Sequence, residues 1–348
     1  MMFTELKYKL YSFPLEKKIQ TSKKTFLSKD VIIIKAIDNS GNIFFSEVSP
    51  LPGFSFDDLT ECKNELDNLI ADKHTFPIKV GDLENHIKRL DKLPALKFGL
   101  EQLLLNLKVN TENQFAGKIK QNLINVNALV SANNLEKTLK EIDNLISKGF
   151  NTIKLKCGIK KFSEEIKIIE EIFTKHQNNI KLRLDINGKW NYPEAKANIK
   201  ALSRFNIEYI EQPVAEKNDL LNLAETSEIN LVPDESIKNY NDAIEFINSE
   251  KFQFLVLKPS IKIGIFGTIK IIETANTKDI KVIITSAFET AIGRTALIYL
   301  ASLANHNFAH GLGIELIGEN IVRSTLKVNN PQIKLDLDML KYQYELKI

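Results

Sequence analysis

Five short apolar runs of this chain each end on a charged residue, at nearly regular intervals. The runs TIKLK, KLRLD, IEYIE, LVPD and FLVLK end at Lys156, Asp185, Glu211, Asp234 and Lys258. Successive ends lie 29, 26, 23 and 24 residues apart (156 to 185, 185 to 211, 211 to 234, 234 to 258), which matches one strand, one loop and one helix. Parallel strands closed into a barrel bring their C-terminal ends to one face, where the catalytic groups of such barrels collect. The pattern therefore predicts a β/α barrel with three carboxylates and two ammonium groups in its mouth, as is typical of an enzyme.

Composition narrows the class of protein and its partners. The 348 residues are 43% hydrophobic and 26% charged, which suits one large domain and a smaller one. The net charge is +3, and the lysines are scattered among acidic neighbours, so we expect no nucleic-acid partner. The apolar run at 31–34 is far too short to span a bilayer, so we expect no membrane partner.

The expected compartment is the cytoplasm. The start of the chain shows no charged n-region followed by an apolar h-region, which would mark a secretory signal. Two cysteines, Cys62 and Cys157, provide no disulfide framework.

The first part of the chain lacks the strand–helix repeat and predicts a separate domain. Apolar or alternating runs predict an antiparallel sheet, and apolar periodicity predicts two helices. The expected strands are 7–11, 31–38 and 43–48, and the expected helices are 56–70 and 94–107. We interpret residues 1–110 as an α+β capping domain.

From residue 125 onward, eight strand-like runs alternate with amphipathic helices. The expected strands are 125–130, 152–156, 181–185, 207–211, 231–234, 254–258, 281–286 and 308–310. Strand–helix repetition implies parallel pairing, and eight units close as a barrel. The alternative, an open doubly wound sheet, lacks a Gly-rich phosphate-binding fingerprint after its first strand. We assign residues 111–321 to the barrel and expect the tail, 322–348, to return to the capping domain.

Alternation along the strands turns the charged residues toward the barrel interior. In TIKLK, Lys154 and Lys156 face inward, and in KLRLD the inward residues are Arg183 and Asp185. Charged side chains are poor core residues unless they are paired or bind a ligand. A non-catalytic barrel is therefore disfavoured, because unused charges at its mouth would be costly to retain.

The three carboxylates at consecutive strand ends predict a metal site. Taken singly, each of Asp185, Glu211 and Asp234 could instead cap a helix or form a surface ion pair. Together they offer oxygen ligands only, which select Mg²⁺, or Mn²⁺, over zinc. A lysine beside such a cation has a lowered pKa and can act as a general base. This combination suits removal of a proton from the carbon next to a carboxylate.

The set Lys-x-Lys, Asp, Glu, Asp, Lys resembles the enolase superfamily, in its muconate-lactonizing subgroup, whose sites pair a lysine base with Mg²⁺. Three further stretches are similar to the o-succinylbenzoate synthase family of menaquinone biosynthesis. They are SPLPGFS at 49–55, FGLE at 98–101 and SAFETAIG at 286–293. The resemblance implies an α/β fold in which an N-terminal α+β domain caps a (β/α)7β barrel.

The resemblance also implies roles for the strand-end residues. Lys156 would be the acid/base catalyst, Asp185, Glu211 and Asp234 the Mg²⁺ ligands, and Lys258 a cation held against the enolate. The implied reaction is dehydration of 2-succinyl-6-hydroxy-2,4-cyclohexadiene-1-carboxylate to 2-succinylbenzoate, in which Lys156 removes the proton and returns it to the departing hydroxyl on the same face.

The main alternative is an isomerase on the same scaffold, an N-succinylamino acid racemase or a dipeptide epimerase. These enzymes resemble the synthases in both lysines but use them from opposite faces. The stretch HGLGI at 310–314 lacks the Asp-x-Asp that would hold a dipeptide amine, which speaks against the epimerase.

Contacts to the small carboxylate substrate are expected from several further residues. Ser286, Ala287 and Gly311 would offer backbone N–H groups to the succinyl carboxylate, with a helix N-cap as the alternative for Ser286. Leu51 and Phe54 would shield the ring from water, with a plain Pro-Gly turn as the alternative. The remaining candidates are Lys154 and Asn187; Asn187 either orders the metal ligands or caps its own loop. The sequence leaves open whether the protein is a monomer or a homo-oligomer.

Overall fold

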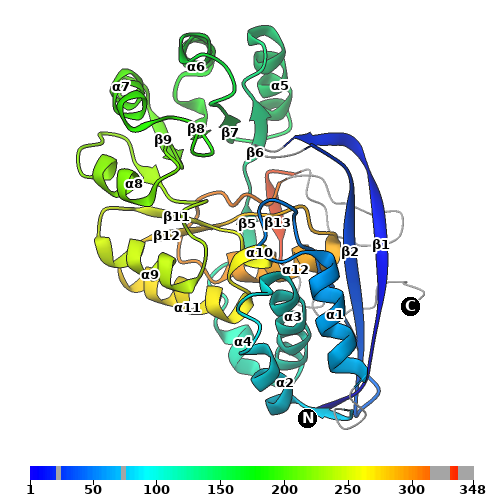
Figure 1. The fold of residues 1–348 in the computed structure, drawn as a ribbon. Coiled ribbons are helices and arrows are strands. Elements are labelled where there is room, and N and C mark those ends of the chain that lie inside the picture. The colour runs from blue at the N-terminus through cyan, green and yellow to red at the C-terminus, as the bar shows by residue number, and fades with distance from the viewer. Residues whose placement is uncertain (21–24, 72–75, 314–329, 336–348) are drawn as a thin grey trace.

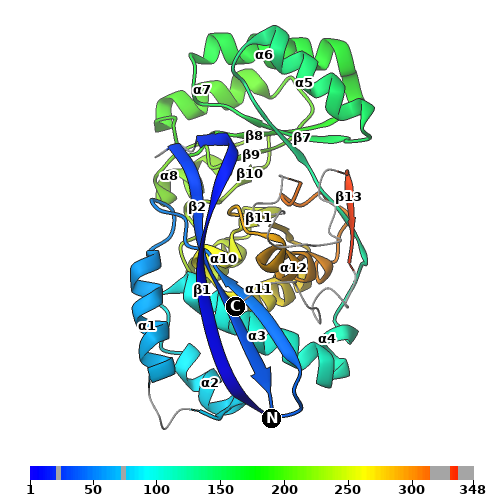
Figure 2. The same cartoon turned by 90° about the vertical axis from the view of Figure 1, so that its right-hand side faces the viewer.

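The chain begins with an antiparallel sheet, as its alternating N-terminal runs predict. The computed structural model describes residues 1–20, 25–71, 76–313 and 330–335. The first sheet has the order β3-β2-β1-β4. Its strands are β1 (Met2–Gln20), β2 (Thr25–Asp38), β3 (Ile43–Val48) and β4 (Ile78–Lys79). β1 and β2 are longer than predicted, and Figure 1 and Figure 2 both show them extending from the region of the N-terminus toward the barrel strands.

Helices cover one side of this sheet. They are α1 (Leu59–Ala71), α2 (Val80–Ile87) and α3 (Pro94–Thr111), which ends one residue past the predicted domain boundary at 110; α4 (Asn113–Gly117) follows it. The two predicted helices, α1 and α3, are confirmed. Buried side chains of β2, α1 and α3, such as Ile32, Leu66 and Leu100, form one apolar core. Gly99 lets α3 lie against β3, because a Cβ there would be 2.5 Å from Val48 Cγ2.

The barrel strands follow in the predicted order. They are β6 (Ala128–Ser131), β7 (Thr152–Lys156), β8 (Lys181–Asp185), β9 (Ile207–Glu211), β10 (Leu231–Val232), β11 (Phe254–Leu257) and β12 (Lys281–Ile284). β10-β9-β8-β7-β6 form one parallel sheet and β11-β12 another. The predicted β/α architecture is confirmed, although β10 is shorter than expected.

Single hydrogen bonds close the two sheets into a ring. Val256 N–H donates to Pro233 O (3.1 Å), which joins β11 to the end of β10. The predicted eighth strand is reduced to two parallel bridges, at His310 and Gly311. His310 N–H donates to Asn125 O (2.7 Å) and Gly311 N–H to Ile284 O (2.9 Å), so this segment lies between the first and seventh strands.

Helices surround the strands (Figure 1). They are α5 (Leu135–Ser147), α6 (Phe162–His176), the 3-10 turn η1 (Gln177–Asn179), α7 (Tyr192–Leu202), α8 (Lys217–Ala224), α9 (Tyr240–Ser249), α10 (Pro259–Lys262), α11 (Ile265–Thr277) and α12 (Ala291–Ser302). Side chains of Asn134, Asn191, Asn239 and Thr290 cap four of them by accepting backbone N–H groups. Each cap satisfies a donor that the first helical turn leaves open.

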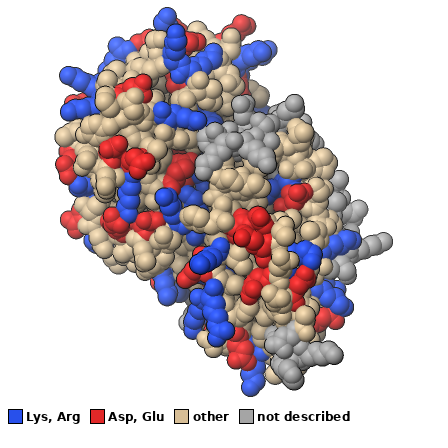
Figure 3. Space-filling model, in the orientation of Figure 1, with Lys and Arg blue, Asp and Glu red and all other residues tan. Residues whose placement is uncertain are grey.

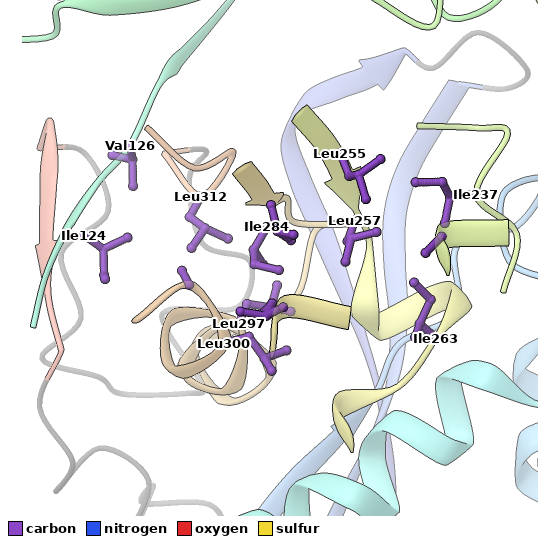
Figure 4. Close-up of a cluster of buried hydrophobic side chains, with 14 of the residues drawn as sticks. Ile124, Val126, Ile237, Leu255, Leu257, Ile263, Ile284, Leu297, Leu300 and Leu312 are labelled. Carbon is purple, nitrogen blue, oxygen red and sulfur yellow. The ribbon is translucent and has the colours of Figure 1, made fainter. Parts of the chain in front are cut away.

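The alternation inferred from the sequence separates two apolar layers. Tyr209, Val232, Phe254, Val256 and Ile283 form a small cluster inside the barrel. Their neighbours along the strands join the larger core between strands and helices. Figure 4 shows part of that larger core, where Ile284 lies near Leu297 and Leu300 of α12 and Leu255 and Leu257 extend from β11.

Two buried carboxylates of the capping domain cap barrel helices. Glu47 on β3 accepts N–H groups of Thr290 (3.1 Å) and Gly293 (3.0 Å) at the start of α12. Glu101 on α3 accepts the N–H groups of Ile265 and Phe266 at the start of α11. The negative charge suits the positive end of each helix dipole, so these contacts anchor the capping domain to the barrel.

The described part of the tail forms a short strand. β13 (Gln332–Lys334) pairs antiparallel with β5 (Leu123–Asn125), just before the first barrel strand. Leu335 N–H extends this pairing to Asn122 O at 2.7 Å. These residues of the tail pair with β5, and the expectation that 322–348 joins the capping domain stays a prediction; 322–329 and 336–348 lie outside the described residues.

The charge on the surface and the length and polarity of the helices can be compared with the partners expected from the sequence. On the face shown in Figure 3, basic and acidic side chains are interspersed and do not gather into a basic patch. In the described part of the chain, every helix is too short or too polar to pass through a bilayer. Cys62 and Cys157 are both buried and form no disulfide.

Candidate active site

Strand pairing brings the five predicted residues to neighbouring strand ends. Lys156 pairs with Asp185 across β7 and β8, and Asp185 with Glu211 across β8 and β9. Glu211 lies beside Val232 of β10, and Asp234 follows two residues later. Lys258 comes directly after β11. The regular spacing in the sequence thus becomes one row along the C-terminal edge of β7 to β11.

Lysines bridge the carboxylates of this row. Lys154 Nζ lies 2.6 Å from Glu211 Oε1 and 3.0 Å from Asp185 Oδ2. Lys258 Nζ forms an ion pair with Asp234 and lies 3.9 Å from Glu235 Oε1. Lys154, predicted to contact substrate, is therefore engaged by two of the predicted metal ligands.

Each predicted metal ligand has one oxygen with no partner among the described residues. Asp185 Oδ1, Glu211 Oε2 and Asp234 Oδ1 are buried and accept no hydrogen bond from that part of the chain. The three residues are only 6%, 0% and 1% exposed. A buried, unsatisfied carboxylate oxygen is costly, and hard oxygen donors suit Mg²⁺. The donor set therefore fits a divalent cation.

The carboxylates are not arranged around one point. Within the described ranges, no three acidic, histidine or cysteine side chains are placed so that they could hold one ion. Lys154 and Lys258 occupy one oxygen of each carboxylate. A cation would have to compete with these two ammonium groups, so the predicted convergence on a metal remains a hypothesis.

The electrostatic environment of the row shifts the pKa values of Lys156 and Lys258 in opposite directions. Burial lowers the pKa of Lys156, with Asp185 opposing this change. Burial also acts to lower the pKa of Lys258, but Asp234 and Glu235 outweigh it, so that this pKa is raised. Of the two amines, Lys156 therefore loses its proton more easily, and Lys258 is held as a cation.

The carboxylates of the row differ in their pKa shifts. Burial acts to raise the pKa of Asp234, but Lys258, Lys262 and Lys154 outweigh it, so that this pKa is lowered. Burial, together with the negative charges of Asp185 and Asp234, raises the pKa of Glu211 despite the opposing effect of Lys154. A bound divalent ion would often be the largest local charge at such a site and would reverse this trend.

The predicted backbone donors to the substrate are engaged inside the protein. Ser286 N–H donates to Gly311 O (3.1 Å), and Gly311 N–H donates to Ile284 O. Ala287 N–H and the Ser286 hydroxyl donate to the two oxygens of Glu289 at 2.9 and 2.6 Å. The prediction that these groups are open to a succinyl carboxylate is wrong for this structure. Ser286 is not the helix cap either, since Thr290 caps α12.

Leu51 and Phe54 lie where the capping domain meets the barrel. Leu51 is buried against Ile261 of α10 and Ala287 of the loop after β12. Lys258 Nζ lies 5.9 Å from the centre of the Phe54 ring. Their proposed shielding role stays a prediction, and their position beside Lys258 is compatible with it.

Asn187 contacts a residue that the sequence reasoning missed. Its side-chain N–H donates to Glu235 Oε1 (3.1 Å), and its backbone adopts a positive φ of 51°. Glu235 was overlooked because it follows Asp234 directly, where alternation along a strand would turn it away. β10 ends at Val232, however, so the alternation no longer applies.

Glu289 and Gln212 were also missed. Glu289 is fully buried and accepts hydrogen bonds from Ser260, Ser286 and Ala287, which joins the loops after β11 and β12. Gln212 accepts the N–H of Asp234 at 2.9 Å and so places the backbone of that candidate ligand. For both Glu289 and Gln212, the sequence offered one indication, namely a polar residue at or after the end of a predicted strand.

A comparison with known families identifies the scaffold. The model described as "Enolase C-terminal domain-like" matches residues 137–336. The chain belongs to the enolase superfamily. The matched residues comprise most of the barrel, and membership of this superfamily agrees with the resemblance seen in the sequence.

The relatives of this chain within the superfamily carry the names of different enzymes. The o-succinylbenzoate synthase of Desulfotalea psychrophila is 26% identical, over 93% of this chain and 97% of the relative. The L-Ala-D/L-Glu epimerase of Francisella tularensis subsp. novicida is 23% identical, over 94% and 95%. Similarity at this level shows an enzyme family but leaves the reaction open between synthase and epimerase.

Solved structures agree with the fold. A dipeptide epimerase from Enterococcus faecalis, complexed with Mg and the dipeptide L-Leu-L-Tyr, has a TM-score of 0.86 at 21% identity, over 97% of this chain and 98% of that one. This likeness confirms the fold class, a capped barrel of the enolase type.

Proposed function

We propose that this superfamily member is an o-succinylbenzoate synthase, a lyase that dehydrates 2-succinyl-6-hydroxy-2,4-cyclohexadiene-1-carboxylate in the cytoplasm as a step of menaquinone biosynthesis. We also propose that residues 1–110 and 111–321 are its capping and catalytic domains. The sequence support is the set of stretches at 49–55, 98–101 and 286–293 together with the synthase relatives.

The observation that carries the proposal is the difference between Lys156 and Lys258. The Lys156 side chain makes no hydrogen bond or ion pair in the described part of the chain, whereas Lys258 is paired with Asp234. One amine is thus free to move a proton and the other is held as a cation. A syn dehydration requires this division of work, while an epimerase needs both lysines to exchange protons from opposite faces.

The proposed sequence of events uses the residues on the row. The substrate carboxylate lies toward Lys258, whose charge stabilises the electron density that develops there. Lys156 takes the proton from the carbon next to the carboxylate, and the electrons of the C–H bond move toward the carboxylate. Lys156 then returns its proton to the hydroxyl, the C–O bond breaks, and water leaves as the ring becomes aromatic.

Asp185, Glu211 and Asp234 would hold Mg²⁺, or Mn²⁺, on the side of the substrate carboxylate. When bound, the ion supplies positive charge against the negative charge of the intermediate.

The alternative is an N-succinylamino acid racemase or dipeptide epimerase. It is supported by epimerase relatives at nearly the same identity as the synthase.

One experiment tests both. Purified protein and Mg²⁺ are incubated with the cyclohexadiene acid while succinylbenzoate absorbance is followed, and separately with N-succinyl amino acids and L-Ala-L-Glu in D₂O. Rapid growth of the absorbance is expected. Deuterium exchange at Cα with little dehydration would reject the synthase in favour of the alternative.

A further inference from the structure

Lys29 is a buried lysine for which the proposed reaction has no use. It lies on β2 and is 3% exposed. Its ammonium group donates to Pro50 O at 2.8 Å and to Ser49 O at 3.2 Å. Both acceptors are backbone carbonyls at the start of one turn, so the lysine holds main chain in place.

The turn that follows, residues 49–55, is internally rigid. Leu51 N–H donates to the Ser55 hydroxyl at 2.7 Å, and Phe54 and Ser55 N–H both donate to Leu51 O at 2.9 Å. Gly53 supplies the positive φ of 82° that this turn requires. The turn therefore moves as a unit, and whatever fixes its first residues fixes its orientation.

The far side of the turn reaches the candidate active site. Leu51 packs on Ile261 and Ala287, and the Phe54 ring lies 5.9 Å from Lys258 Nζ. Ile261 belongs to α10, which follows β11, and Ala287 to the loop after β12. The orientation of the turn thus sets the position of Phe54 over Lys258.

The local charges explain why a lysine can be buried here. Burial lowers the pKa of Lys29 to about 8, while the carboxylates of Glu289, Glu47, Asp30 and Asp57 act to raise it. The ammonium form therefore persists at neutral pH. An apolar side chain at this position would leave two buried carbonyls without their donor.

We propose that Lys29 is a positioning residue for substrate binding, which holds the 49–55 turn of the capping domain so that Phe54 covers the substrate beside Lys258. The inference rests on the proposed function for the identity of the substrate. The holding of the turn itself rests only on the contacts of Lys29.

The test compares Lys29→Met with Lys7→Met, which removes an exposed lysine of β1 in the same sheet. Amide hydrogen exchange of the peptide containing residues 51–55 reports on the turn without reference to activity. Steady-state kinetics with the cyclohexadiene acid reports KM and kcat separately. If Lys29→Met does not fold, Lys29→Leu, which also lacks a donor for the two carbonyls, takes its place with the same expectations.

For Lys29→Met we expect exchange in 51–55 to accelerate at least about tenfold and KM to rise about tenfold, the effect of one or two lost hydrogen bonds. kcat should stay within about threefold, because Lys156 and Lys258 are on the barrel. Lys7→Met should change neither. A folded variant with wild-type exchange overturns the proposal, as does faster exchange with an unchanged KM.

The outcome remains distinct from failure of the proposed function. If the wild-type protein does not dehydrate the cyclohexadiene acid, the synthase assignment fails, while the exchange comparison still decides whether Lys29 holds the turn. KM is then measured with the N-succinyl amino acid or dipeptide that the protein does turn over.

Discussion

The molecule buries two groups of carboxylates that look alike by exposure and differ in their partners. The interface group consists of Glu47 and Glu101, which reach barrel helices from the capping domain, and Glu289, a barrel residue beside Glu47. The strand-end group consists of Asp185, Glu211 and Asp234, and none of the six is more than 6% exposed. The interface group accepts backbone N–H groups and hydroxyls. In the strand-end group each residue is bridged by a lysine and has one oxygen with no partner among the described residues.

This difference separates a structural from a functional use of buried charge. A carboxylate whose oxygens are satisfied by helix N-termini stabilises the arrangement of the two domains. A buried carboxylate with an open oxygen is costly for the folded state and is expected where a ligand completes it. The comparison predicts that substitutions in the two groups will affect different measurements.

The largest effect is expected at the free amine beside the strand-end group. Lys156→Ala should leave the fold intact and reduce kcat at least about a thousandfold, because the only proposed acid/base group is gone. Circular dichroism and the dehydration assay check both parts. Lys161→Ala, an exposed lysine nearby, is the control, and dehydration near the wild-type rate in Lys156→Ala would remove Lys156 from its role.

The next effect concerns stability alone. Glu47→Ala should lower the free energy of unfolding by about 3 kcal/mol, since it leaves the buried N–H groups of Thr290 and Gly293 without their acceptor. Urea denaturation measures the change, and Glu136→Ala on the exposed side of α5 should stay within about 0.5 kcal/mol. Equal stability of the two variants would contradict the structural role of the interface group.

A substitution in the strand-end group should act on the metal. Asp234→Asn is expected to weaken Mg²⁺ binding roughly 30-fold, or about 2 kcal/mol, by removing a charged oxygen donor. Isothermal titration calorimetry of the purified protein measures this without turnover. Asp82→Asn, an exposed carboxylate of α2, serves as the control; an unchanged Mg²⁺ titration in Asp234→Asn would count against the ligand assignment.

The smallest effect is a pH dependence at the interface. Burial raises the pKa of Glu101 to about 7, against the opposing effects of Lys97 and the Ile265 N–H. The folded state then holds this proton more tightly than the unfolded state, so stability should fall as pH rises from about 4.5 to about 7.

Glu101→Gln should flatten this part of the stability curve by about 1–2 kcal/mol, since an amide does not titrate. Denaturation midpoints of both proteins at pH 5 and pH 7.5 provide the comparison. Parallel curves would show that Glu101 does not carry the dependence.

Particular residues show how far sequence reasoning reaches. The ends of β7, β8 and β9 were predicted to the residue, because charged residues closing alternating runs are a local signal. The alternation also predicted that Lys154 and Lys156 both face the barrel interior. It does not indicate how deep in the barrel each side chain lies. The structure shows the deeper Lys154 bound to Asp185 and Glu211, while Lys156 stays unbound in the described region.

Sequence predictions were wrong where the local residue pattern indicated one structure and hydrogen bonds to distant parts of the chain produced another. The segment at 308–310 was predicted as a strand and forms only single bridges in the described part of the chain. β13, which was not predicted, pairs with the edge of β5. Ser286 and Ala287 were predicted from their place at a strand end. The Ser286 N–H donates instead to Gly311 O and the Ala287 N–H to Glu289, and no periodicity could indicate the inward direction of Glu289.

The sequence by itself determined the strand–helix repeat, the inward side of each strand and the row of charges at the strand ends, since these depend on spacing within a few residues. Only the tertiary structure decided which charges are paired, which oxygens remain open and which carboxylates anchor the capping domain. Those outcomes depend on contacts such as Glu47 with Thr290, 243 residues apart, and on backbone N–H directions that exist only after the chain has folded.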